Sequence, residues 1–252
     1  MINNYLHQPR FWLLHLILPL ILGLFLAFIY PHTSMDAFLI KPFYDSAALV
    51  FHLKDDWFLE SFMHQYLKNL MIAVGLMMFG LWALGLITQF FKIRFFNKPQ
   101  CSSLHTYHQQ FLWVFVAMVI STSAISILKH FSNHACPWDL LAYGGTQPFI
   151  PLFESLPLGA VPGHCFPGGH ASGGFALMAF YLGFRDSLPK VAKVGLILGL
   201  LFGFAMGWGQ MMRGAHFMSH NLWTGWIVWM ILLGQYLIWS PTEGKSCVVR
   251  KL

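Results

Sequence analysis

Six long apolar blocks dominate the chain, and they constrain its fold more than any other feature of the sequence. They cover about residues 11–30, 69–91, 111–128, 171–185, 191–211 and 221–239. A helix needs about 20 apolar residues to cross the hydrocarbon core of a bilayer. Since 57% of the 252 residues are apolar and only 10% are charged, we predict an all-α, polytopic membrane protein with six transmembrane helices and a core helical bundle.

Two blocks need comment. The first follows Arg10, but it is long for a signal peptide and no small-x-small cleavage site precedes Pro31, so we expect it to stay in the protein as a helix. The fourth is short and contains Gly173 and Gly174.

Residues 57–67 (WFLESFMHQYL) are typical of an outer amphipathic helix at the membrane interface, either a platform for a lipid substrate or an anchor for the loop. No linker divides residues 1–252, so we expect a single domain.

The distribution of basic residues predicts the orientation. With a cytoplasmic N-terminus, ten of the fifteen Lys and Arg residues fall on the inner side. They are Arg10, Lys92, Arg94, Lys98, Arg185, Lys190, Lys193, Lys245, Arg250 and Lys251. This is the positive-inside pattern, with both termini inside and residues 31–68, 129–170 and 212–220 outside. No basic run with interleaved aromatic residues indicates a nucleic-acid partner.

A glycine-rich turn precedes the fourth block. Gly168 and Gly169 stand before His170 in the sequence P-G-G-H. Two glycines let a backbone approach an anion closely, and the N-terminus of a following helix supplies unpaired N–H groups and a positive dipole end. The turn is therefore a candidate phosphate-binding element.

A second cluster lies between the fifth and sixth blocks. Arg213, His216 and His220 are spaced so that they share one face if this segment is helical. Arginine binds phosphate oxygens through a planar fork, and a neutral imidazole can act as nucleophile or base. His220, or Asn221 beside it, would hold the tautomer of His216. Lys129, at the end of the third block, either reaches the headgroup region or gives a point charge to the same phosphate.

These fragments occur in a recognisable order. Lys129 precedes Cys136-Pro137 by seven residues, P-G-G-H follows at 167–170, and R-G-A-H-F-M-S-H follows at 213–220. On a six-helix membrane protein, this order resembles the type-2 phosphatidic acid phosphatase superfamily of lipid phosphatases, over about residues 111–240. The resemblance implies that His216 attacks phosphorus, that His170 protonates the leaving oxygen and that Lys129 holds the phosphoryl oxygens, without a metal or other cofactor.

The chain departs from the family pattern at four positions. Cys136 replaces the arginine of the first motif, Gly168 a serine of the second and His220 an aspartate of the third. Gln210 stands where the third motif has its arginine, and Arg213, one turn closer to the histidine, is a candidate substitute. Loss of one transition-state donor typically costs about 10²–10³ in rate. The retained residues are those that move protons and form bonds, so we expect activity.

Cys136 and Cys165 share the second outer loop. Disulfides form in oxidising compartments such as a bacterial envelope. A disulfide between the two would join the first motif to the second, whereas two unpaired buried cysteines are the alternative.

The leading hypothesis is a metal-independent lipid phosphatase of the bacterial inner membrane, with its site on the periplasmic side and a lipid phosphate as substrate. Polyprenyl diphosphates, phosphorylated glycerolipids and lipid A all fit, and transfer of the phosphoryl group to a second lipid is a near variant. A rival is a metalloenzyme in which His216 and His220 bind zinc or iron with His164 or His170. A lipid-binding relative without activity is the third possibility.

Overall fold

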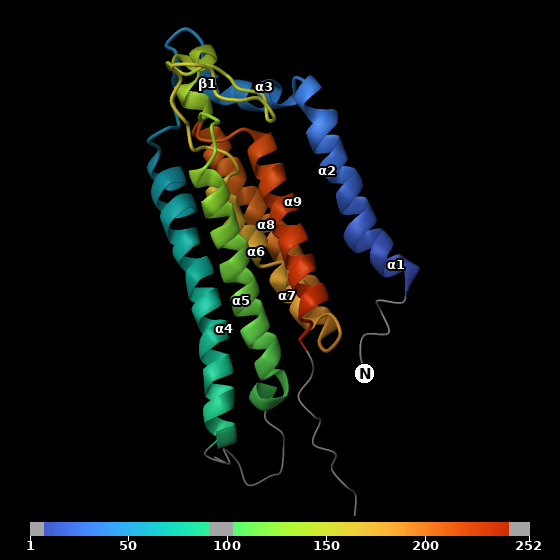
Figure 1. The fold of residues 1–252 in the computed structure, drawn as a ribbon. Helices are drawn as coiled ribbons and strands as arrows, with labels where there is room; N and C mark the ends of the chain where they lie inside the picture. Colours follow the sequence, from blue (N-terminus) through green and yellow to red (C-terminus); the bar gives the residue numbers. More distant parts are fainter. Residues whose placement is uncertain (1–7, 91–102, 242–252) are drawn as a thin grey trace, which may run out of the picture.

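The computed structural model describes residues 8–90 and 103–241. Within these ranges five helices are long and apolar enough to cross a membrane, and they lie side by side in one bundle (Figure 1). Their bounds are Pro9–His32, Phe58–Thr88, Thr106–His130, Pro189–Met212 and Met218–Ile238. The chain is therefore an integral membrane protein, and five of the six predicted spans are present.

Several elements are preceded or interrupted by short π-helical and 3-10 stretches. The first span comprises α1 (Pro9–Trp12), a π-helical stretch (Leu13–Ile17), α2 (Leu18–Phe28) and a 3-10 turn (Tyr30–His32). The outer segment after it contains α3 (Met35–Ile40), a 3-10 turn (Lys41–Phe43) and strands β1 (Tyr44–Asp45) and β2 (Val50–Phe51), which pair antiparallel. The remaining spans are a π-helical stretch (Phe58–Tyr66) with α4 (Leu67–Phe90), α5 (Ser103–His130), α8 (Pro189–Met212) and α9 (Met218–Ile238). Two 3-10 turns (Pro137–Asp139 and Leu141–Tyr143) follow α5.

The fourth predicted span is a short helix in two parts, α6 (Gly169–Ala176) and α7 (Ala179–Phe184), at the centre of the bundle (Figure 1). At the break, the N–H of Leu177 donates to the Gly174 carbonyl at 3.1 Å and the N–H of Met178 donates to Phe175 at 2.9 Å. These i to i+3 bonds tighten the chain where an α-helix would continue. The sixteen residues from Gly169 to Phe184 extend only about 24 Å, so the expected count of six full-length spans is not confirmed.

The sequence predicted a separate amphipathic helix over residues 57–67, but these residues are the first part of a longer helix. The π-helical stretch Phe58–Tyr66 continues directly into α4 as one long helix. Its apolar face packs against α8: a Cβ on Gly209 would lie 3.6 Å from Met63 and 3.8 Å from Leu59. One face of this stretch therefore contacts another helix, whereas Phe58, Phe62 and Tyr66 remain exposed. Sequence periodicity does not distinguish contact with a helix from contact with lipid.

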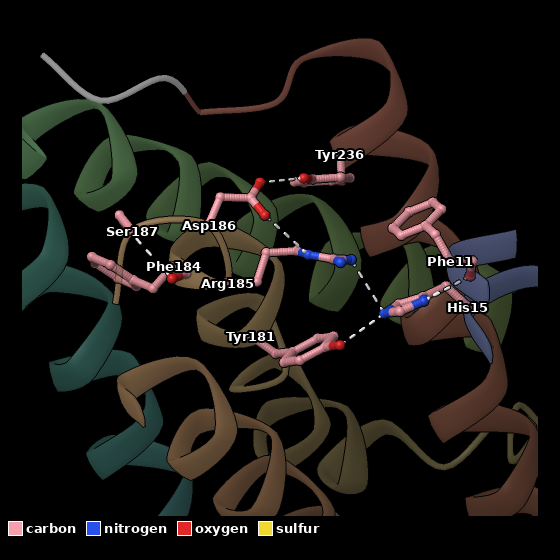
Figure 2. Close-up of polar contacts among 8 residues, drawn as sticks. All are labelled: Phe11, His15, Tyr181, Phe184, Arg185, Asp186, Ser187 and Tyr236. Carbon is pink, nitrogen blue, oxygen red and sulfur yellow. Dashed lines mark hydrogen bonds and ion pairs between the residues drawn. The ribbon is translucent and has the colours of Figure 1, made fainter. Parts of the chain in front are cut away.

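A polar cluster joins the first span to the rest of the bundle at the end opposite α3 and β1 (Figure 2). Nδ1 of His15 donates to the Phe11 carbonyl at 2.8 Å, and Nε2 lies 2.8 Å from the Tyr181 hydroxyl and 3.2 Å from Arg185. The Arg185 guanidinium also lies 3.3 Å from Asp186. Each buried polar group of this cluster thus has a hydrogen-bond or ion-pair partner, which offsets the cost of removing it from water.

The two ends of the bundle differ in charge. Arg10 lies in α1, Arg185 follows α7, and Lys190 and Lys193 lie in the first turns of α8, so these four predicted inner residues share one end (Figure 1). The other six predicted inner residues, together with Cys101 and Cys247, lie outside the described residues. Lys129, His170 and Arg213 lie toward the opposite end, where α5 ends and α6 begins.

Candidate active site

His216 and His220 meet at the turn between α8 and α9. Their Nδ1 atoms are 3.3 Å apart, and both rings are almost completely buried. The segment is not continuously helical as the spacing had suggested, because α8 ends at Met212 and Gly214 adopts a φ of +78°. A side chain at Gly214 would also overlap the ring of Phe51. Glycine therefore permits the turn that brings His216 back over the first turn of α9.

The start of α9 is held by a distant acidic residue. Asp36, from α3, accepts hydrogen bonds from the backbone N–H of Ser219 at 2.9 Å and from the Ser219 hydroxyl. A carboxylate at a helix N-terminus interacts favourably with the unpaired N–H groups and the positive end of the dipole. Burial raises the pKa of Asp36 above its usual value, and the bonds from Ser219 oppose that shift. The contact fixes the position of His220, the next residue.

Lys129 lies over the first residue of α6. A Cβ on Gly169 would be 3.5 Å from Cδ and 3.8 Å from Nζ of this lysine. No carboxylate within residues 8–90 and 103–241 forms an ion pair with Lys129. An ammonium group and the positive end of a helix therefore converge next to His170, an arrangement that favours a bound anion.

His170 has a neighbour that the motif analysis missed. The ring of His64, from the π-helical stretch before α4, lies with its centroid 3.6 Å from that of His170. The charges of Lys129, Lys68 and Arg213 also act on His170. The only sequence signal for His64 is its place in the amphipathic stretch 57–67, four residues before Lys68.

The other predicted residues have mainly supporting contacts. The Arg213 Nε–H donates to the Lys54 carbonyl at 2.7 Å, and Nη2 lies 3.7 Å from Glu60. The Gly168 N–H donates to the His220 carbonyl at 3.2 Å and is therefore engaged. The amide of Asn221 donates to Gly207 at 3.0 Å, so this residue joins α9 to α8. The Gln210 side chain is buried, and the backbone carbonyl of Gln210 accepts the N–H of Ala215.

A disulfide joins Cys136 to Cys165, with the Cα atoms 5.2 Å apart. Beside it the N–H groups of Gly163, His164 and Cys165 donate to the carbonyls of Asn133, Ser132 and His134. The sulfur of Cys165 lies 3.4 Å from Nδ1 of His216. The segment after α5, the segment before α6 and the turn before α9 therefore form one connected wall around His216.

Burial dominates the electrostatics of His216. It lowers the pKa of His216 well below its usual value, and the charges of His220, Lys129 and His170 lower it further. An imidazole with this environment stays neutral at pH 7 and keeps a lone pair for attack on phosphorus. The same charges show that Lys129 and His170 lie within electrostatic range of His216.

Comparison with known proteins gives one match, to the family model described as the PAP2 superfamily, over residues 110–242. This segment is more than half of the chain and contains every predicted site residue. The chain belongs to the PAP2 superfamily. No curated protein and no solved structure matches it significantly. Membership of this phosphatase family indicates a hydrolase that acts on phosphate esters.

The PAP2 match begins at residue 110, within α5, but a cavity at the site extends to α4. It encloses about 650 Å³, within the range of small-molecule pockets. Lys68, Lys129 and His170 close one end, and α4 and α5 supply apolar walls that include Ile72 and Val119. These two residues are exposed, so the groove opens sideways. From Lys129 to Phe115 the groove follows α5 for about 21 Å.

The PAP2 motif residues also include one cluster with ligand atoms for a metal. Cys165, His216 and His220 place such atoms within 4.8 Å of one another. By contrast, His164 stacks on His130, and the ring of His170 packs at a tilt against His64. The thiolate form of cysteine is the metal ligand. Since the sulfur of Cys165 is in a disulfide, the oxidised site offers two imidazoles and no thiolate.

Proposed function

We propose that this PAP2 protein is a metal-independent lipid phosphatase that works through a phosphohistidine on His216. The observation that carries the proposal is the groove between α4 and α5, which is apolar along its length and ends at Lys129 and His170. A lipid has the same polarity: an apolar chain that ends in an anionic headgroup. Because the groove opens sideways between two membrane-spanning helices, a lipid can enter from the bilayer.

The residues divide the reaction between them. With its proton on Nδ1, His216 donates to Nδ1 of His220, and its Nε2 keeps the lone pair that attacks phosphorus. Lys129 and the N–H groups at the start of α6 stabilise the charge on the phosphoryl oxygens. The negative charge of the bound phosphate favours the protonated form of His170, which gives its proton to the departing oxygen. His170 then takes one from the water molecule that releases phosphate and restores His216.

The orientation of the proposal follows from the charges. Ten of the fifteen Lys and Arg residues fall on the predicted inner side, and this bias favours a cytoplasmic position for the end that carries Arg10 and Lys190. It supports a site at the outer face of a bacterial inner membrane. The disulfide supports this placement, because such bonds persist in oxidising compartments.

Phosphate release from phosphatidic acid, prenyl monophosphate and prenyl diphosphate tests the proposal. We expect the purified protein to release phosphate and His216→Ala to abolish release while the elution profile in detergent is unchanged. His32→Ala, which removes an exposed histidine, is the matched control and keeps full activity. Brief incubation with labelled substrate should leave an acid-labile, alkali-stable label on the wild type alone. Unchanged turnover by His216→Ala would refute the assigned nucleophile.

Two further outcomes separate the alternatives. Labelled phosphate that appears on a second lipid would indicate a transferase. The cluster of Cys165, His216 and His220 motivates a metal test. Activity lost to a chelator but unaffected by vanadate would favour the metalloenzyme, whereas we expect inhibition by vanadate and none by the chelator.

A further inference from the structure

The wall of the site formed by α4 lies outside the segment that matches the family. His64 precedes α4 and Lys68 lies in its first turn, while the match begins at residue 110. The ring of His64 packs on His170, and its Nδ1 is buried without a hydrogen-bond partner in the described part of the chain. Both residues thus belong to the same site as the motif residues.

Lys68 is a second uncompensated cation at the head of the groove. It lines the cavity with Lys129 and His170, and its charge acts on the rings of both His64 and His170. Among residues 8–90 and 103–241 no carboxylate pairs with it. By contrast, Arg213 pairs with Glu60. Lys68 therefore adds a cation to the lysine that the motif analysis assigned to the phosphoryl group.

The position of Lys68 indicates which part of a substrate it would meet. His216 does not line the groove, whereas His170 and Lys68 do. In the proposed reaction the nucleophile attacks phosphorus opposite the leaving oxygen, and His170 protonates that oxygen. The leaving group therefore lies on the groove side with the lipid chain. A cation at that place has an anionic partner only if the leaving group is itself charged.

We propose that Lys68 and His64 form a subsite for the second phosphate of a lipid diphosphate, whose leaving group is a lipid monophosphate. This inference rests on the proposed function and specifies its substrate. Lys68 supplies positive charge next to the inner phosphate, and His64 supplies a ring nitrogen beside His170. The two side chains also compensate for the cationic anchors that the family motifs have lost at Cys136 and Gln210.

The step balances without a further reactant. Nε2 of His216 bonds to the terminal phosphorus, and the bond from that phosphorus to the bridging oxygen breaks. The bridging oxygen leaves with the lipid monophosphate and takes the proton of His170, while Lys68 holds the charge on the inner phosphate. Water then attacks the phosphohistidine and gives its proton to His170, and inorganic phosphate leaves.

The test compares farnesyl diphosphate with farnesyl monophosphate, which share a chain and differ in one phosphate. The wild type should prefer the diphosphate in kcat/KM. Lys68→Gln should lower kcat/KM for the diphosphate by about tenfold or more, the range for loss of a hydrogen bond to a charged group. The same substitution should change kcat/KM for the monophosphate by less than about threefold. His64→Gln should lower kcat/KM for both substrates, because the His64 ring packs on His170, and the loss should be larger for the diphosphate. Lys190→Gln, at the opposite end of the bundle, is the matched control and should change neither substrate.

The results separate this inference from the proposed function. The diphosphate subsite would be overturned if Lys68→Gln lowered kcat/KM equally for both substrates or for neither, or if the wild type preferred the monophosphate. None of these results would contradict the proposed phosphatase activity. A wild type that hydrolyses neither substrate would overturn both. Because Lys68 is exposed, its substitution does not disturb the core, and an unchanged elution profile confirms that the variant is folded.

Discussion

Removal of the disulfide should cost both stability and activity. The variant Cys136→Ala/Cys165→Ala opens a loop with a sequence separation of 29. The chain-entropy relation for a loop of this length gives about 3.6 kcal/mol at 25 °C. This value is an upper limit, because α5 and α6 flank the loop and remain helical when a membrane protein unfolds in detergent. For a chain of this size it corresponds to a decrease of at most about 7–14 °C in the unfolding temperature.

The effect on activity has a separate cause. The sulfur of Cys165 lies 3.4 Å from Nδ1 of His216, and the disulfide holds the loop between Lys129 and His170 against the turn that carries this histidine. Without it the nucleophile is less well positioned, and misplacement by about 1 Å can cost about 10²-fold in rate. We therefore expect kcat to fall more than KM rises.

Thermal unfolding in detergent and phosphate release at 25 °C measure the two effects. A reductant added to the wild type should reproduce the behaviour of the double variant, and the same reductant should leave the double variant unchanged. The reasoning is refuted if the double variant unfolds at the wild-type temperature and keeps the wild-type kcat.

Three other predictions concern different parts of the molecule. Because burial lowers the pKa of His216, its neutral form persists below pH 6.5. Protonation of His216 should therefore lower kcat/KM only well below that pH, which a pH profile of kcat/KM from 4 to 8 checks. Gly75→Trp, which would fill the groove near Met118, should raise KM for a long-chain lipid phosphate. It should leave KM for a short-chain lipid phosphate unchanged, as measured by parallel titrations. His15→Leu removes a hydrogen-bond partner of the Arg185 guanidinium and should lower stability by about 1.5–3 kcal/mol; thermal unfolding should show the loss while activity at 25 °C is retained.

The spans were predictable because hydrocarbon thickness imposes a length on any crossing helix. Residues 111–128 and 191–211 were identified in this way, and they lie within Thr106–His130 and Pro189–Met212. The central pair α6 and α7 was less predictable, since helices surrounded by other helices need not span the bilayer. The approach of Gly174 to Gly203, where an added Cβ would lie 2.4 Å from the backbone nitrogen, depends on packing that no hydropathy pattern contains.

The motif residues were predictable in part. The contacts between Lys129 and Gly169 and between His216 and His220 join residues that the motifs had already singled out. His64 was missed because a histidine in an amphipathic helix has no distinctive spacing, and its role depends on how α4 packs. The ion pair of Arg213 with Glu60 was equally hidden, since the two residues are far apart in the sequence.

The bond from Asp36 to Ser219 has a consequence for anyone who wishes to transplant this catalytic unit. A fragment cut at residue 110 would carry each family motif, yet α9 would begin without its acidic cap and the groove would lack one side. Chimeras with related enzymes should therefore exchange the segment before residue 110 together with the motif-bearing part, because the two segments are one functional unit despite the boundary that sequence similarity suggests.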